Sequence, residues 1–303
     1  MVQSANFAVL GKNIAPDLGK KGPASDLAFY DRKDSDVIRT WVHPTGYPDK
    51  IQPMIQAIAM SEFAVLCVEK LDKFAGEQII ALDMLKKDRG VLLHTFDVDA
   101  GRLEGMIKGT AVEKYVRAEH DTVREAVDAF EPIQNDGPPE VVVDQCFDVK
   151  GVGTVILGNV TSGTIKQYDT LKLYPGGAEV LVKSIQMHDD PVTESAAPAR
   201  VGLAVKGARP EDVGRGDVLC ADADVRTEME LDFAKSPFYK GTPTEGQGCL
   251  ACVGLQIRAA KFSSLSPLKL AFEKPVVCKE GQTVMILKPE SETVRIMGSG
   301  TIR

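Results

Sequence analysis

Apolar positions along the first 130 residues follow two periods. Short runs in which every position is apolar, such as residues 63–68, are typical of buried strands, and segments such as residues 49–60 space apolar side chains as helices do. The pattern predicts strands at 7–10, 27–30, 37–42, 63–68, 91–93 and 113–118, and helices at 49–60, 75–87 and 121–130, with Gly90 ending the second helix. Alternation of helices with fully apolar strands predicts a mostly parallel sheet covered on both faces.

The pattern changes at residues 131–139, which read EPIQNDGPP and offer little to bury. Beyond them the helical period disappears, and short alternating runs are separated by glycines, as in small β-barrels. We therefore expect an α/β domain at 1–131, a linker at 132–139, and two β-barrels at 140–222 and 223–303. The predicted fold class is α/β plus all-β.

Charge and composition narrow the classes of partner. The chain has 303 residues and a formal net charge of −7, and neither half carries the basic excess of proteins that bind DNA by bulk attraction. Charged residues interrupt every long apolar run, and the first residues lack the pattern of a secretion signal. We expect a cytoplasmic protein that binds neither DNA nor a membrane.

Six cysteines are dispersed through apolar runs, which predicts buried, reduced thiols. Cys249 and Cys252 form a single Cys-x-x-Cys pair. A zinc site needs two further ligands, and neither Cys220 nor Cys278 has a partner at ligand spacing. Residues three apart on a strand point to opposite faces, so we expect no metal site.

Several motifs occur in a fixed order in the centre of the chain. They read FDVKGVGTV at 147–155, SGTI at 162–165, SIQMH at 184–188, RVGLAVKG at 200–207 and DVGRGDVL at 212–219. This segment resembles the second domain of translational GTPases of the elongation factor Tu type, and within them SelB and its archaeal relatives. The resemblance implies a G domain resembling P-loop NTPases in front, two barrels behind it, GTP hydrolysis with Mg²⁺, and contact with tRNA and the ribosome.

The phosphate-binding loop of that family needs the spacing Gly-x-x-x-x-Gly-Lys-Ser/Thr. Here seven residues separate Gly11 from Gly19, Lys20 follows, and Lys21 takes the place of the hydroxyl residue. We expect the loop and most of the following helix to be deleted. Gly11, Gly19 and Lys20 are then remnants of a nucleotide site.

The other two nucleotide motifs also depart from the family. Residues 43–47 read HPTGY where the family has Asp-x-Pro-Gly-His. His43 replaces the acid and Tyr47 replaces the histidine, so of these site residues only Gly46 is kept. Residues 94–97 read HTFD where the family has Asn-Lys-x-Asp, which keeps Asp97 alone. Because the acid and the catalytic histidine are replaced and the phosphate-lysine role does not carry over to Lys20, we expect no catalytic residue and no cofactor.

The resemblance also places two residues near the pocket for the acceptor end of tRNA, His188 and Arg200. The leading hypothesis is a SelB-like paralogue that has lost GTP binding and acts as a scaffold for RNA, a ribosomal surface or a protein. One alternative is a divergent active GTPase that delivers aminoacyl-tRNA, with Lys12, Lys20 and Lys21 holding the phosphates of GTP. Another is a protein-interaction module unrelated to translation.

Overall fold

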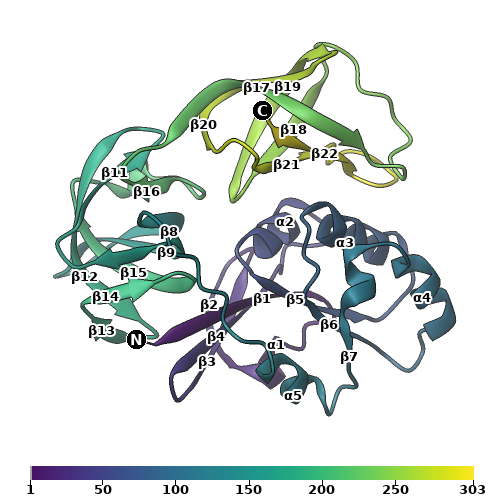
Figure 1. Cartoon of the computed structure of the whole chain (residues 1–303), viewed down its shortest axis with the longest axis horizontal. Helices are drawn as coiled ribbons and strands as arrows, with labels where there is room; N and C mark the ends of the chain where they lie inside the picture. Colours follow the sequence, from purple (N-terminus) through teal and green to yellow (C-terminus); the bar gives the residue numbers. More distant parts are fainter. Residues whose placement is uncertain (1) are drawn as a thin grey trace.

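The computed structural model describes residues 2–303, which form three domains arranged in a ring (Figure 1). Domain I comprises the elements that precede the first barrel. Its strands are β1 (Gln3–Gly11), β2 (Lys20–Ala24), β3 (Ala28–Asp34), β4 (Val37–His43), β5 (Phe63–Val68), β6 (Gly90–His94) and β7 (Val116–Arg117). Its helices are α1 (Ala15–Leu18), α2 (Gln52–Ala59), α3 (Lys73–Met84), α4 (Ala100–Ile107) and α5 (Val123–Asp128), with a 3₁₀ turn η1 (Ala111–Lys114).

One sheet of order β2-β3-β4-β1-β5-β6-β7 runs through domain I. The strands from β4 to β7 pair in parallel, and β2 and β3 add an antiparallel edge. The largely buried strand β1 and the fully apolar strand β5 lie at its centre, with α2, α3 and α4 packed on one face and α1 and α5 on the other. The predicted mostly parallel, doubly covered sheet is therefore confirmed.

Two local predictions in domain I were wrong, and one helix was missed. Helix α3 ends at Met84, and Gly90 instead begins β6, where a Cβ atom would lie 2.3 Å from the carbonyl oxygen of Ala64. The strand predicted at 113–118 is the turn η1 followed by the two-residue strand β7. Helix α4 was not predicted; Asp99 caps it by accepting a hydrogen bond from the Arg102 N–H.

The first barrel follows a segment, residues 130–139, that has no helix or strand. It is built from β8 (Glu140–Val149), β9 (Gly153–Ser162), β11 (Thr170–Tyr174), β12 (Ala178–Met187), β15 (Ala199–Lys206) and β16 (Val218–Cys220), and closes because β11 pairs with both β12 and β16. The short strands β10 (Thr164–Lys166), β13 (Asp190–Val192) and β14 (Glu194–Ala196) and a 3₁₀ turn, η2 (Pro210–Asp212), complete it.

The second barrel closes through the strand order β17-β20-β19-β18-β21-β22. Its strands are β17 (Asp224–Lys235), β18 (Gly248–Val253), β19 (Gln256–Leu265), β20 (Leu268–Cys278), β21 (Thr283–Leu287) and β22 (Ile296–Ile302). The fold class predicted from the sequence, one α/β domain followed by two β-barrels, is confirmed.

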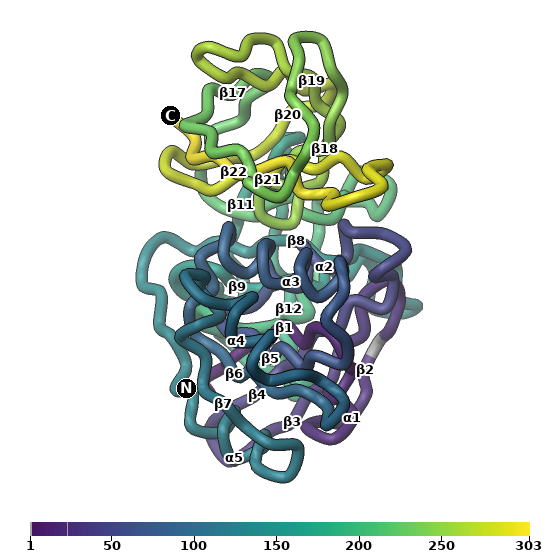
Figure 2. The backbone as a smooth tube through the Cα atoms, turned by 90° about the vertical axis from the view of Figure 1, so that its right-hand side faces the viewer, coloured from purple at the N-terminus to yellow at the C-terminus, as the bar shows by residue number. Residues whose placement is uncertain are grey.

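The second barrel sits on helices α2 and α3 of domain I (Figure 2). Leu255, Met285 and Ile296 share one apolar core with the inner faces of these helices. Within this interface the Gln56 side-chain amide donates to the carbonyl oxygen of Leu255 at 3.0 Å. On the other side of the ring, the Asn159 amide of the first barrel donates to the carbonyl oxygen of Met60 at 3.0 Å. Domain I is thus bound directly to both barrels.

The two cysteines of the Cys-x-x-Cys pair face opposite sides of β18, as predicted. Cys249 lies in the core of the second barrel, and Cys252 faces α2 and α3. Burial raises the pKa of the Cys249 thiol to about 12 and raises the pKa of Cys252 as well. Across residues 2–303 the structure gathers no group of three or more His, Cys, Asp and Glu side chains able to hold a metal ion.

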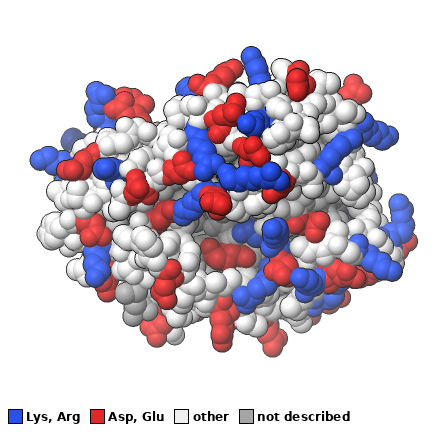
Figure 3. Space-filling model, turned by 45° about the horizontal axis from the view of Figure 1, so that its top comes forward, with Lys and Arg blue, Asp and Glu red and all other residues white. Residues whose placement is uncertain are grey.

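Surface charges of both signs are intermingled on the face displayed in Figure 3. Among the described residues there is no helix with the length and apolar character needed to traverse a bilayer.

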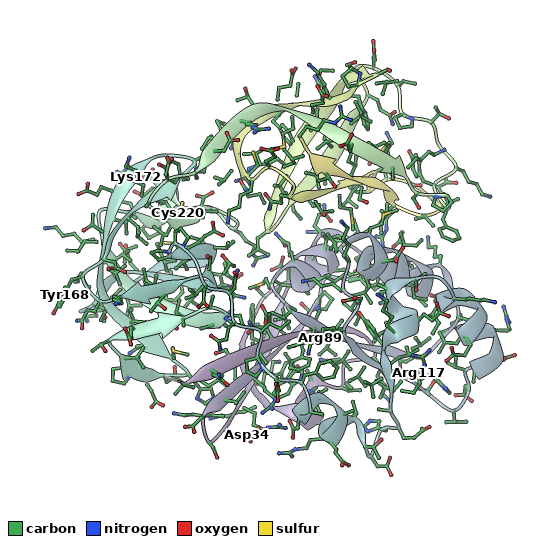
Figure 4. The ribbon with its side chains drawn as sticks, in the orientation of Figure 1. Asp34, Arg89, Arg117, Tyr168, Lys172 and Cys220 are labelled. Carbon is green, nitrogen blue, oxygen red and sulfur yellow. The ribbon has the colours of Figure 1, made fainter. Side chains whose placement is uncertain are left out.

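In domain I, the Arg89 guanidinium lies 4.8 Å from the Phe63 ring centroid and 5.8 Å from that of Phe130, and so covers one edge of the aromatic core (Figure 4).

Candidate functional site

The carboxyl end of β1 is where the sequence predicted a remnant of a phosphate loop. Gly11 has φ of +75°, and a Cβ atom there would lie 2.0 Å from the carbonyl oxygen of Cys67 on the neighbouring β5. The Lys12 N–H donates to that same oxygen, and the Asn13 side chain accepts from the N–H of Ala15. Close packing of two strands therefore accounts for the glycine, and the chain passes at once into the single turn of α1.

Gly19 and Lys20 lie away from this point. Gly19 is extended and packs so closely on the Trp41 ring that a Cβ atom would lie 2.9 Å from it. Lys20 opens β2, and the strand register places it level with Asn6, in the middle of β1 and three strands across the sheet. With about 4.8 Å between strands and about 3.3 Å per residue, Lys20 is about 20 Å from Gly11.

The loop after β4 holds the remnant of the second motif, and its polar groups are engaged within the chain. His43 donates its Nδ1–H to the Val9 carbonyl oxygen at 3.0 Å, and burial lowers the pKa of the imidazole. The Gly46 N–H donates to the carbonyl oxygen of Asp26. The Tyr47 hydroxyl donates to the Phe74 carbonyl oxygen at 2.9 Å, and burial raises its pKa.

Asp97 lies in the turn after β6, with an exposed side chain beside Phe96, which is 94% exposed. Because β1, β4 and β6 are parallel to one another, Gly11, Gly46 and Asp97 all follow carboxyl ends at one edge of the sheet. The structure thus gathers three of the five predicted nucleotide residues at this edge and places Gly19 and Lys20 elsewhere.

A groove between domain I and the first barrel contains the other candidates. It has a volume of about 280 Å³. Lys20 and Lys21 line it from β2, Arg200 from β15, and His188 from the turn between β12 and β13. The sequence assigned Lys20 to the nucleotide site and assigned His188 and Arg200 to the tRNA pocket. The structure places all three in one groove.

Arg200 is held rigidly on the groove wall. Its guanidinium carbon lies 3.6 Å from the centroid of the Phe29 ring, and Nη1 lies 3.3 Å from Oδ2 of Asp144. The side chain is 14% exposed, and its buried Nη2 finds no hydrogen-bond partner among the described residues. Stacking on Phe29 and pairing with Asp144 fix the orientation of this planar group.

Arg215 forms a second cationic feature that the sequence analysis did not single out. It binds Asp26 with two hydrogen bonds, of 2.8 and 3.1 Å, and its Nε lies 3.2 Å from Oδ1 of Asp144. Burial opposes ionisation of Asp26, but the bonds from Arg215 outweigh it and lower the Asp26 pKa. With Lys50 and Arg258 it lines a groove of about 410 Å³. The sequence pointed to Arg215 only through its place in the DVGRGDVL motif. The pairing with Asp26 could not be predicted, because the two residues are far apart in the sequence.

Comparison with known proteins places these features in a family. The family described as elongation factor Tu domain 2 matches residues 153–220. A Methanocaldococcus jannaschii relative, uncharacterized protein MJ0325, is 32% identical over 96% of this chain and 96% of its own length. The selenocysteine-specific elongation factor of that organism is 27% identical over 67% of this chain and 49% of the relative. The chain belongs to the SelB-related translational GTPases.

Solved structures agree with this assignment at the level of fold. SelB from Methanococcus maripaludis, in complex with the GTP analogue GppNHp, superposes on all of this SelB-related chain with a TM-score of 0.83 at 20% identity, using 79% of its own length. A bacterial selenocysteine-specific elongation factor gives 0.77 at 17% identity, using 58% of its length. The chain spans about half the length of the curated selenocysteine-specific factor. An elongation factor 1-alpha from Archaeoglobus fulgidus is 35% identical over 32% of this chain, and the match covers 23% of that relative.

Proposed function

We propose that this SelB-related chain works without GTP and acts as an RNA-binding scaffold. One observation carries the proposal: groups that would meet the nucleotide are engaged in contacts within the chain. Gly11 packs on the Cys67 carbonyl, the Gly46 N–H bonds to Asp26, and the Tyr47 hydroxyl bonds to Phe74. Phosphoryl transfer depends on free hydrogen-bond donors and cations placed around the phosphates. Because these groups make contacts within the chain instead, GTP hydrolysis at this position is not supported.

The residues present do not fit a magnesium nucleotide. A phosphate loop needs consecutive free N–H groups, a lysine and a hydroxyl at its end, whereas α1 has four residues and Lys20 lies on β2. His43 stands where the family has an acid, and Mg²⁺ prefers oxygen ligands. We assign no catalytic residue and derive no step of GTP hydrolysis.

Nucleotide binding is the direct test. Isothermal titration of the full chain with GTP, GDP and GppNHp in the presence of Mg²⁺ is expected to show no binding at ligand concentrations up to about 1 mM, which corresponds to about 4 kcal/mol. Methanococcus maripaludis SelB, solved with GppNHp, is the positive control. Micromolar binding would contradict the proposal and favour a divergent GTPase. Loss of that binding in Lys20→Ala/Lys21→Ala would then support phosphate contacts from these lysines.

The groove between domain I and the first barrel supports RNA as the ligand. Lys20, Lys21 and Arg200 face it together with His188, against the acids Asp31 and Asp189. A groove that combines two lysines with an arginine stacked on an aromatic ring suits the unpaired end of an RNA, because single-stranded ends expose both phosphates and base edges. We therefore propose the acceptor end of tRNA as its ligand.

Fluorescence anisotropy with tRNA carrying or lacking its single-stranded 3′ end tests this assignment. Lys20→Ala/Lys21→Ala is expected to weaken binding by about tenfold at low salt and to reduce the salt slope by about 1 to 2, since each phosphate contact releases counterions. Lys172→Ala, on the outer wall of the first barrel (Figure 4), is the matched control. Equal weakening by Lys172→Ala, or equal affinity for tRNA lacking the 3′ end, would contradict the assignment.

A further inference from the structure

A pocket distinct from both cationic grooves lies where the three domains meet. It has a volume of about 240 Å³. The end of α2 lines it from domain I, β8, β9 and β16 line it from the first barrel, and the turn between β18 and β19 and the end of β20 line it from the second. Pockets for small organic ligands measure about 300–1,000 Å³, so this one suits a compound at or below the small end of that range. Its apolar lining includes Ala59, Met60, Val142, Val160, Leu255 and Val277.

The wall that the two barrels share is rigid. Gly216 of the first barrel has φ of +90°, and a Cβ atom there would lie 2.5 Å from the backbone nitrogen of Gln256 in the second. The Gln256 side chain in turn donates to the Val277 carbonyl oxygen at 2.7 Å and accepts from the Val277 N–H at 2.9 Å. This amide is buried and has both of its ends paired. The pocket is therefore held open between fixed walls.

Asn159 lines the same pocket with one end of its amide unpaired. The residue is 6% exposed, and its Nδ2 donates to the Met60 carbonyl oxygen at 3.0 Å. Its buried Oδ1 finds no hydrogen-bond partner within residues 2–303. A buried acceptor without a partner costs free energy, and native proteins pair nearly all such groups. A ligand that donates a hydrogen bond to Oδ1 would remove this cost.

Glu62 brings a carboxylate to the pocket from domain I. Its Oε2 accepts from both the N–H and the side-chain amide of Asn6, at 2.9 and 3.0 Å. Burial nevertheless raises the pKa of the Glu62 carboxyl group. Lys87 attracts this carboxylate, but its Nζ donates to the Ser61 carbonyl oxygen instead. A cation inside the pocket would supply the charge compensation that the chain leaves incomplete.

The other charged groups of the lining neutralise each other. Lys279 of the second barrel lies 2.5 Å, Nζ to Oε2, from Glu140 of the first, and Glu140 also accepts from the Thr161 hydroxyl at 2.8 Å. Because the one lysine of the lining is paired in this way, Glu62 gives the pocket a net negative charge. An anionic ligand would be repelled, and a cationic ligand would be attracted.

We propose that this pocket binds a small aliphatic amine, with its ammonium group against Glu62 and Asn159 and its stem along the apolar walls. An ammonium group carries three N–H donors and no acceptor, so it can serve the carboxylate and the unpaired Oδ1 together. Since the walls come from all three domains, the bound amine would hold the ring together. The proposal does not depend on whether the chain binds GTP or RNA.

Titration calorimetry of the full chain with three compounds that share one stem tests the charge. They are n-hexylamine as its hydrochloride, sodium hexanoate and n-hexanol, at constant pH and ionic strength. The amine is expected to bind about tenfold or more tightly than either of the others. It should also bind about tenfold more tightly than n-butylamine, because two more methylene groups are buried. The melting temperature of the chain should rise with the amine alone.

Two variants locate the binding. Glu62→Gln keeps the shape of the side chain and removes its charge, so it should weaken the amine about tenfold or more and leave hexanol unchanged. Ala59→Leu should weaken both compounds by filling the pocket. Glu69→Gln is the matched control, because it makes the same change at the exposed opposite end of β5 and should have no effect. Thermal melting without ligand verifies that each variant folds.

Three results would overturn the proposal. The first is failure of n-hexylamine to bind, which would mean that water alone occupies the pocket. The second is equal binding of hexanoate, which would show that the charge of Glu62 does not select the ligand. The third is amine binding that survives Ala59→Leu, or that Glu62→Gln and Glu69→Gln weaken equally, since the amine would then bind elsewhere on the chain.

Discussion

Replacing Glu77 by alanine is expected to lower the free energy of unfolding by about 3–5 kcal/mol, because it leaves a buried guanidinium without its counter-ion. Glu77 of α3 is fully buried and accepts from Arg295, which precedes β22. The Nη2–Oε2 distance is 2.6 Å, both Nε–oxygen distances are 3.1 Å, and the Arg295 backbone N–H donates to Oε1 at 2.8 Å. Arg295 also donates to the Pro48 carbonyl oxygen, so this side chain ties the second barrel to two parts of domain I.

Chemical denaturation followed by circular dichroism measures the effect. Lys114→Ala is the control, since its pair with Asp88 is exposed and should contribute at most about 1 kcal/mol. The double variant Glu77→Leu/Arg295→Met should recover much of the loss, because it removes both buried charges together. A Glu77→Ala variant as stable as Lys114→Ala would show that the pair is not a significant interdomain link.

Gly11→Ala is expected to destabilise domain I by about 4 kcal/mol or more, which is exceptional for so small a change. The new Cβ would lie 2.0 Å from a carbonyl oxygen of β5, and the backbone at Gly11 is in the left-handed region. Because both strands lie at the centre of the sheet, neither can shift without disturbing its neighbours.

Gly151→Ala separates the two contributions. Gly151 has a similar φ of +83°, but a Cβ atom there would meet nothing within 4 Å, so that variant carries only the backbone strain of about 1–2 kcal/mol. Thermal and chemical denaturation of both variants give the difference. If Gly11→Ala cost no more than Gly151→Ala, strand packing would not explain the glycine, and a role in ligand binding would regain weight.

Strand and helix periodicity was sufficient to predict most of the fold. Strand β5 was predicted at its observed bounds, and α2 and α3 were placed within a few residues, because long apolar patterns reflect burial directly. Helix α4 was missed because two glycines in eight residues weaken its helical signal.

The candidate site was predicted less completely, and the reason is geometric. Motif order could indicate that Gly11, Gly46 and Asp97 lie at the carboxyl ends of parallel strands, but it could not show that β2 takes Lys20 to the far edge of the sheet. Nor could it show that Lys20 and Arg200 line the same groove, since this depends on how the first barrel sits on domain I. Ion pairs such as Arg215 with Asp26 join residues 189 positions apart, which no local pattern reveals.

The apolar core shared by α2, α3 and the second barrel has a consequence for biosynthesis. The helices are complete once residue 84 has been made, whereas the side chains that cover them, from Leu255 to Ile296, are translated last. At a synthesis rate of about 5–20 residues per second, the nascent polypeptide spends roughly ten seconds or more with this apolar helix surface exposed to solvent. Chaperone capture during elongation at the ribosome would protect it from aggregating before its own C-terminal portion emerges.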